Sequence, residues 1–572
     1  MGADITYKVG ILGCPAKPDV EWTHENLSIL RHLGFNMMQL NIAWGGRPRD
    51  EPLNLEDVVE LPVDKQEALA QEVPLQSDLS SEKRARRKTE LQQRIQLCRD
   101  AGIRTLFHFG APYNGAYGYD GSSLPNCLLD AKTEQRYICL LEQFAKEFPG
   151  VDDLLVYTFD QNAWLCNEFG GCKNCRGIPL HERVVPFINR LAKKWHSLNP
   201  SGKLWWEPWE LSAGQVLKSI GSLSSEGLGL ALHSNIAEVM ATLPVDRWLK
   251  NACSLAGRKG IDVIVEGWLG AASEELEPFI SLAHPLVTLR QLRAIAAVDG
   301  VRGVKEYYGL LPGKDDPNLR TTELFFSRPD ISDEEALANL SRPYGSVAAR
   351  MVEFWELCSA GMELFPWETS WYIREIGKCN VRHSMSAAFI RGQQCATPSW
   401  ESTRRAIFMK TDDSQPHPWM LEDVQLRCDL AARKMEEALS LGRHIQTEIG
   451  KEFADDFSNG LEELAGFARR AWSYVYHLRE TNLATTMRLI RGEGSDVPGF
   501  LKGEMLDLLK ADRENQQCRE PLESAIRLFE QDIDSFLETY FTVINGFETS
   551  GGVCLSAADF SVTSRKERPC GQ

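Results

Sequence analysis

The sequence has 572 residues, of which 43% are hydrophobic and 25% are charged, as in an ordinary globular protein. A chain of this length buries a large core, which excludes an intrinsically disordered protein and a small disulfide-stapled domain. The net charge of −17 argues against a protein that binds nucleic acid or an anionic membrane surface, because such affinity rests on basic side chains.

The first 330 residues alternate apolar β-type runs with amphipathic helical runs. In one helical run, Val184, Ile188 and Leu191 recur at spacings of three and four. Because a helical run precedes each of the last seven strand candidates, the pattern predicts an α/β fold, a (β/α)8 TIM barrel. A doubly wound open sheet is the alternative, but no glycine-rich phosphate loop follows the first strand. The eight strand candidates are Tyr7–Gly13, Phe35–Ile42, Ile103–Phe109, Asp153–Asp160, Lys203–Glu207, Leu228–His233, Ile261–Glu266 and Val301–Tyr308.

A glycine stands just before seven of these eight strands. Glycines at these positions predict that each preceding helix ends at a glycine with left-handed backbone, after which the chain enters the strand. These glycines are Gly34, Gly102, Gly150, Gly202, Gly227, Gly260 and Gly300.

Three segments depart from the barrel pattern. Residues 51–80 form an acidic insertion after the second strand, either a lid or rim loop of the active site or a passive insertion. Helical periodicity dominates later, as in Leu522, Ile526 and Phe529, so we expect the barrel at 1–330 and a helical C-terminal domain at 331–548. Residues 549–572 are rich in Gly and Ser and then charged, which predicts a flexible tail.

Carboxylates end four of the predicted strands, and each has Trp or Tyr beside it. The chemistry of a barrel gathers at the carboxyl ends of its strands. Two carboxylates in different environments act as acid and base, or as acid and nucleophile, on a glycosidic bond. The catalytic candidates are Asp160, Glu207, Glu210 and Glu266. The bulky rings in Trp205–Glu210 favour Glu207 or Glu210 as the protonated acid, and Asp160 or Glu266 as the ionised partner.

Aromatic rings stack on sugar faces, and His, Asn and acidic side chains hydrogen-bond to sugar hydroxyl groups. Trp205 and Trp206 are neighbours on one strand, so at most one of the two lines the barrel interior. The substrate-binding candidates are Trp44, His108, Asn162, Trp164, Trp206, Trp209, His233, Trp268, Glu306, Tyr307 and Tyr308.

A cysteine motif follows the fourth strand. Cys166, Cys172 and Cys175 include one Cys-x2-Cys pair, a common half-site for zinc. The motif is compatible with a structural zinc site and with a loop of packed free thiols. In a zinc site, the fourth ligand would be Cys127, His181 or none. A catalytic metal is not expected, because no His-x-His or His-Glu-x-x-His occurs.

Together, these motifs resemble barrel glycoside hydrolases of the family 20 and family 67 type and related uncharacterised bacterial barrel proteins. The resemblance covers about residues 5–375 and rests on Asp160, the following cysteine loop and the aromatic Trp355–Tyr372 stretch. Family 20 enzymes use an Asp-Glu pair at the fourth strand, whereas here Gln161 follows Asp160. The similarity to other barrel glycosidases, with acids at strands four and seven, would select Asp160 and Glu266.

The sequence therefore predicts a glycoside hydrolase that acts on a carbohydrate substrate and needs no cofactor. A non-catalytic carbohydrate-binding barrel and a sugar isomerase or lyase are the alternatives. The odd number of 15 cysteines, the lack of a signal peptide and the lack of an 18-residue apolar run predict a cytoplasmic protein without a membrane span. We expect no nucleic-acid partner, and a homo-oligomer stays open.

Overall fold

The computed structural model describes the greater part of the chain up to Leu364 and one long helix beyond it. The described residues are 5–13, 20–42, 51–69, 80–112, 127–158, 166–208, 211–233, 245–270, 283–364 and 418–452, apart from short gaps at 167, 169–170, 212, 246 and 314–315, together with a few residues between 523 and 535.

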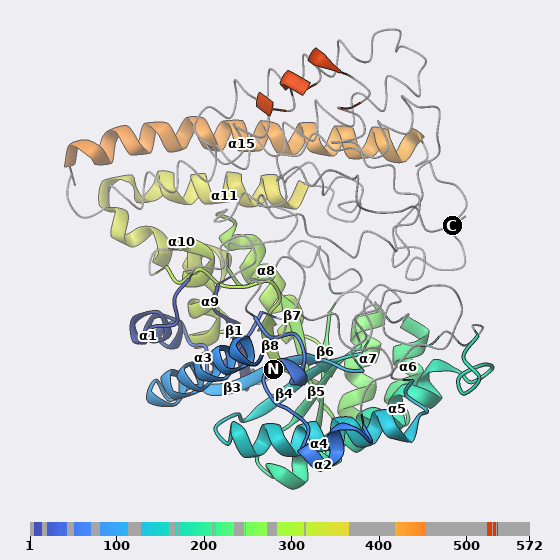
Figure 1. The fold of residues 1–572 in the computed structure, drawn as a ribbon. Coiled ribbons are helices and arrows are strands. Elements are labelled where there is room, and N and C mark those ends of the chain that lie inside the picture. The colour runs from blue at the N-terminus through green and yellow to red at the C-terminus, as the bar shows by residue number, and fades with distance from the viewer. Residues whose placement is uncertain are drawn as a thin grey trace. The chain divides into compact units, whose positions relative to one another are not determined.

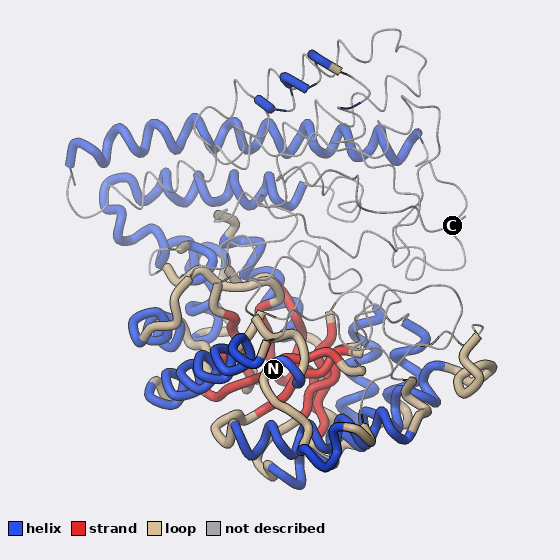
Figure 2. Tube along the Cα trace, viewed as in Figure 1, coloured by secondary structure: helices blue, strands red, loops and turns tan. Residues whose placement is uncertain are grey.

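Eight parallel strands close into a barrel in sequence order, which confirms the predicted (β/α)8 fold. Each strand pairs with the next along the chain, and the first pairs with the last, where Val9 lies opposite Lys305. The strands are β1 (Tyr7–Ile11), β2 (Met37–Gln39), β3 (Arg104–Gly110), β4 (Asp153–Tyr157), β5 (Leu204–Glu207), β6 (Leu228–Leu232), β7 (Asp262–Gly267) and β8 (Val301–Glu306). Figure 2 shows them in red, with helices around them.

Helices connect successive strands, as Figure 1 shows by chain order. Several begin at side-chain caps: Ser80 accepts the backbone N–H of Lys83, and Asp130 accepts that of Lys132. The helices of the barrel are α1 (His24–His32), α2 (Val63–Gln66), α3 (Ser81–Asp100), α4 (Ala131–Glu147), α5 (Leu180–Leu198), α6 (Ala213–Ile220), α7 (Arg247–Arg258), α8 (Pro285–Ala296), α9 (Pro317–Ser327) and α10 (Asp333–Ser341), with a short 3-10 helix, η1, at Leu55–Asp57.

The glycines before the strands serve two different purposes. Five of the seven have positive φ, as their place before the strands predicts: Gly34, Gly102, Gly227, Gly260 and Gly300. Gly202 is needed for close approach instead, since a Cβ there would lie 2.0 Å from the carbonyl oxygen of Asp152. The same reason applies to Gly150, because a Cβ added there would lie 2.5 Å from the side chain of Ile95.

Apolar side chains fill both sides of the barrel wall. Outside, strand residues such as Phe107, Val156 and Val265 pack against the helices in one large core. Inside, one layer of side chains fills the barrel, consisting of Val9, Met37, Leu106, Leu155, Trp205, Ala231 and Ile264, with Tyr7 against it. Such inward layers make the barrel a solid core rather than a pore.

The acidic insertion packs onto the carboxyl ends of β2 and β3. The backbone N–H of Gly110 donates to the carbonyl of Leu53 at 3.0 Å, and the Asn41 side chain donates to the carbonyl of Pro52 at 2.9 Å. Its acids pair with arginines of α3 and α4: Glu51 with Arg94, Asp57 with Arg87 and Glu56 with Arg136. Residues 51–69 therefore form a rim of the barrel, held by buried charge pairs.

The described residues divide into two compact units. The first is the barrel, which extends through α10 to Pro343. The second begins at Tyr344, at the junction η4 (Arg342–Val347), and comprises α11 (Ala348–Leu364) and α15 (Pro418–Glu452). Arg350 of α11 pairs with Glu448 of α15. Among the described helices, none combines the length and apolar character that a membrane span requires. The tail at 549–572 lies outside the described residues.

Candidate functional site

A layer of polar side chains lies directly above the apolar interior layer, toward the carboxyl ends of the strands. Successive side chains of a strand point to opposite faces, so the residue two positions beyond an inward residue points inward again. Two positions beyond Leu106, Trp205, Ala231 and Ile264, the chain places His108, Glu207, His233 and Glu266. With three further members, we call this set the polar layer: Gln39, His108, Tyr157, Glu207, His233, Glu266 and Lys305.

One contact in the polar layer is a buried ion pair that joins β7 to β8. Glu266 and Lys305 occupy paired positions in the register of the two strands. The Lys305 ammonium donates to Glu266 Oε1 at 2.6 Å, and both side chains are fully buried. Among the described residues, the other oxygen of this carboxylate, Oε2, has no hydrogen-bond partner. Glu266 is thus an ion-paired carboxylate with one oxygen available to a further group.

A second contact joins β3 to β5. The Gln39 amide donates to the carbonyl of Asn41 at 2.7 Å and lies 3.4 Å from His108 Nδ1. Because that amide nitrogen is a donor, Nδ1 accepts and the proton of a neutral His108 lies on Nε2. Nε2 faces Glu207 Oε2 at 3.6 Å. Burial holds the pKa of His108 well below its usual range, and the Lys305 ammonium lowers it further, so the imidazole is neutral at pH 7.

Burial makes the polar layer costly for folding. His108, Glu207, Glu266 and Lys305 are each at most 5% exposed. Removing charged groups from water costs several kcal/mol per ion, and replacing a buried ion pair by apolar side chains is often neutral or stabilising. Titratable groups gathered at the carboxyl end of a barrel are therefore better explained by chemistry than by stability.

The two neighbouring tryptophans of β5 point to opposite sides of the barrel wall. Trp205 lies in the apolar interior layer, and its Nε1 donates to Asp153 at 3.1 Å. Trp206 lies in the outer core between strands and helices, and its Nε1 donates to the Thr158 hydroxyl at 3.1 Å. The assignment of Trp206 to substrate binding is therefore corrected: Trp206 does not line the barrel interior.

Glu306, a predicted substrate-binding residue, holds the loops after β7 and β8. Its carboxylate accepts backbone N–H groups from Leu269 at 2.8 Å, from Tyr308 at 2.9 Å and from Gly309 at 3.1 Å. Burial raises the pKa of Glu306 to about 8 against these donors. Its neighbour Lys305, which the sequence did not single out as a site residue, is the one that joins the polar layer.

The remaining aromatic candidates at these strand ends are buried. Trp268 is 1% exposed, and Tyr307 and Tyr308 are 6% and 0% exposed. Their contact with substrate stays a prediction. Six further candidates lie outside the described residues: Trp44, Asp160, Asn162, Trp164, Trp209 and Glu210.

Sequence reasoning missed three members of the polar layer. Gln39, Tyr157 and Lys305 stand at the ends of β2, β4 and β8, and the His108 and Tyr157 rings are 4.8 Å apart. The signal that finds them is the stride of two from an inward apolar residue, such as Met37 to Gln39. The structure also brings the three predicted cysteines together with Cys127 in one buried cluster.

Comparisons with known proteins support the fold. No family model matches the sequence, and no curated protein matches it. A solved enzyme of glycoside hydrolase family 138, which targets the pectin rhamnogalacturonan II, is similar with a TM-score of 0.54 at 11% identity, over 94% of this chain and 68% of that chain. A mutant O-GlcNAc hydrolase from Thermobaculum terrenum has a TM-score of 0.39 at 10% identity, over 93% of this chain and 96% of its own. At such identities the likeness to the family 138 enzyme establishes a shared barrel fold, and the resemblance to families 20 and 67 stays a prediction.

Proposed function

We propose that this protein hydrolyses glycosidic bonds with a pair of carboxylates from the polar layer, Glu266 and Glu207. The observation that carries the proposal is the difference between their surroundings. Glu266 lies 2.6 Å from the Lys305 ammonium, whereas Glu207 faces the neutral imidazole of His108. Two carboxylates held in unlike environments divide the roles of acid and of base or nucleophile between them.

Glu266 is the ionised partner in this proposal. Its ion pair with Lys305 stabilises the carboxylate, and Oε2 is free of hydrogen bonds from the described residues. That oxygen attacks the anomeric carbon, or it takes a proton from an attacking water molecule. The separation of the two carboxyl groups in a complex with substrate distinguishes these routes, since retaining enzymes need about 5–5.5 Å and inverting enzymes about 6.5–9.5 Å.

Glu207 is the acid. It is buried at the end of β5, two residues beyond Trp205, and it faces the neutral imidazole of His108 rather than a cation. It donates its proton to the leaving oxygen as the glycosidic bond breaks. A water molecule then supplies hydroxyl to the sugar and returns the proton, so that one bond and one water give two products. Asp160 and Glu210 are the alternative carriers of the two roles.

The substrate class in this proposal is a carbohydrate. His233, Tyr157 and Gln39 offer donors and acceptors of the kind that bind sugar hydroxyl groups, and the cation of the polar layer, Lys305, is paired with Glu266. The family 138 enzyme with the same fold targets a pectin, which supports a glycan substrate.

The buried lysine favours a second candidate, a sugar lyase or isomerase. Lys305 is 1% exposed near the carboxyl end of β8, and a buried lysine amine is a group that forms Schiff bases with carbonyl substrates. Borohydride treatment in the presence of reducing sugars tests this reading: it would add the mass of a reduced sugar to Lys305.

A panel of 4-nitrophenyl glycosides tests the proposed hydrolysis. We expect the protein to release 4-nitrophenol from at least one sugar, and the Glu266→Gln variant to lose this activity by about 10³-fold or more. Glu182→Gln is the matched control, because Glu182 lies on α5 with its side chain 59% exposed. A protein that binds sugars but cleaves none of the panel would favour the non-catalytic barrel instead.

A further inference from the structure

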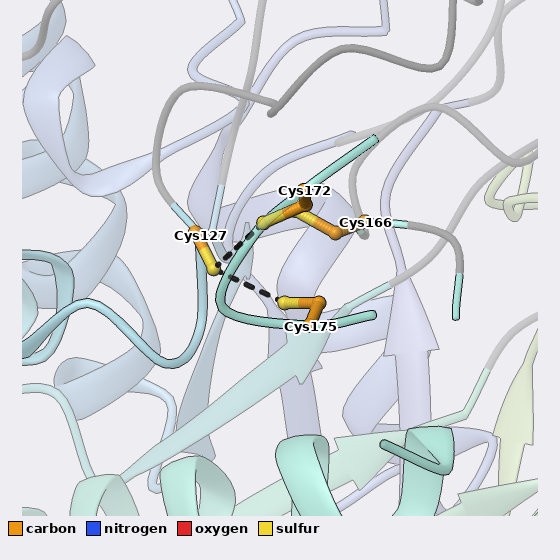
Figure 3. A group of neighbouring side chains, drawn as sticks. All are labelled: Cys127, Cys166, Cys172 and Cys175. Atoms are coloured by element: carbon orange, nitrogen blue, oxygen red, sulfur yellow. Dashed lines mark hydrogen bonds between the residues drawn. The ribbon is translucent and has the colours of Figure 1, made fainter. Parts of the chain in front are cut away.

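Four buried cysteines from two neighbouring loops converge on one point beside the barrel. Cys127 lies between β3 and α4, and Cys166, Cys172 and Cys175 lie between β4 and α5. Figure 3 shows their sulfur atoms turned toward one another. All four are at most 7% exposed, and their sulfur atoms lie within 4.8 Å of one another.

The distances suit a metal better than a disulfide or simple packing. Cys127 Sγ lies 3.1 Å from Cys175 Sγ and 3.7 Å from Cys172 Sγ. A disulfide requires about 2.05 Å, so none of these pairs is bonded. Zinc–sulfur bonds of about 2.3 Å in a tetrahedron place the sulfur atoms about 3.8 Å apart, in the middle of the observed range.

The backbone around the Cys-x2-Cys pair forms a compact turn that directs both sulfur atoms to one side. The N–H groups of Cys175 and Arg176 both donate to the carbonyl of Cys172, at 3.2 and 3.0 Å. Gly177, with φ of 75°, closes the turn, and its N–H donates to the carbonyl of Glu168 at 2.8 Å. The pair is thus preorganised, and the turn costs no further ordering when a metal binds.

Charge around the cluster matches a metal with four thiolates, which carries a net charge of −2. Arg183 of α5 is 2% exposed and donates to the carbonyl of Cys166 at 2.6 Å. Lys173 and Arg176 lie exposed in the same loop.

We infer that Cys127, Cys166, Cys172 and Cys175 bind one zinc ion in a closed, structural site. Four cysteines complete a tetrahedron, which leaves no position for water or substrate. The ion would cross-link the loop after β3 to the loop after β4, and the second loop contains Asp160 and Asn162. The inference does not depend on the proposed hydrolysis, because metal content is measured without any substrate.

Elemental analysis of the full chain, purified with reductant and without chelator, tests the inference. We expect about one zinc per chain, released when an organomercurial reagent has consumed about four thiols. Cobalt in place of zinc should give the visible bands and the sulfur-to-cobalt charge-transfer band of a tetrahedral tetrathiolate. Neither measurement requires a variant to fold.

Variants locate the ion. Cys127→Ser and Cys172→Ser should lose most of the bound zinc and unfold at lower temperature. Cys139→Ser and Cys253→Ser should keep it, because these two cysteines lie outside the cluster. Three outcomes would overturn the inference: a folded wild-type chain that takes up no zinc when zinc is supplied, iron in its place, or disulfides among these cysteines in the native protein.

Discussion

Lys305 Nζ lies 2.6 Å from Glu266 Oε1, across paired positions of β8 and β7 at the carboxyl end of the barrel. The same ammonium acts on His108 of β3, whose pKa it helps to lower. One buried cation therefore influences both an ion-paired carboxylate and the imidazole that faces Glu207. This arrangement is the basis of the division of roles that we propose for Glu266 and Glu207.

Removal of Lys305 alone should cost both stability and activity. In Lys305→Met the Glu266 carboxylate stays buried without its cation, and we expect a loss of about 3–5 kcal/mol in the free energy of unfolding. The double variant Lys305→Met with Glu266→Leu should recover most of that stability while hydrolysis stays lost. Urea unfolding and glycoside turnover, measured on both variants, separate the two effects. Activity in the stable double variant would contradict the proposed role of the pair.

Glu207→Gln should affect substrates according to their leaving groups. An acid matters most when the leaving oxygen needs a proton, so alkyl glycosides should slow by about 10²–10⁴-fold and 4-nitrophenyl glycosides far less. The fall of the hydrolysis rate on the alkaline side of the pH profile should also become weaker in this variant. Wild-type dependence on leaving group and pH in this variant would move the acid to Glu210 or another carboxylate.

His284 should make stability fall in acid. Burial lowers the pKa of His284 from 6.5 to about 4, so the unfolded chain takes up a proton that the folded chain refuses. Stability is therefore complete above about pH 6.5 and is lost as the pH falls toward 4. In His284→Gln this dependence should weaken, whereas the exposed His32→Gln should keep it. Equal slopes of unfolding free energy against pH in wild type and His284→Gln would contradict the account.

Substitutions of two neighbouring arginines of α3 should have very different effects on the free energy of unfolding. Arg87 is 7% exposed and pairs with the buried Asp57 at 3.0 Å, whereas Arg86 is 51% exposed beside Glu90. Arg87→Met leaves a buried carboxylate of the rim unpaired, and we expect a loss of about 3 kcal/mol. Arg86→Met should change the free energy of unfolding by less than about 0.5 kcal/mol. If Arg87→Met lowered the free energy of unfolding as little as Arg86→Met in urea, the charge pairs of the rim would contribute little to stability.

The strands were predictable because parallel strands buried on both faces read as continuous apolar runs. The same property hides the direction of each side chain, since a run without alternation does not reveal which neighbour points inward. Hence Trp206 was expected to line the barrel, whereas Trp205 is the neighbour that lies inside it, and Lys305 of the polar layer was not singled out. Both carboxylates of the proposal, Glu207 and Glu266, stood out because they end apolar strands.

The cysteine cluster was predictable only in part. Cys166, Cys172 and Cys175 lie close together in the sequence, so their spacing indicates a half-site. Cys127 belongs to the preceding β/α unit, and only the closure of adjacent strands β3 and β4 brings it to the others. The choice between Cys127 and His181 as the fourth member required the fold.

Chemical rescue of Glu266→Ala tests the central claim most directly. Without its carboxylate, this variant should hydrolyse an activated aryl glycoside at least about 10³-fold more slowly than wild type. Added azide should take the place of the missing carboxylate, restore turnover and yield a glycosyl azide, identified by mass spectrometry and by the configuration of its anomeric carbon. Glu182→Ala should hydrolyse at the wild-type rate and form no azide product. Wild-type hydrolysis by Glu266→Ala in the absence of azide would contradict the claim.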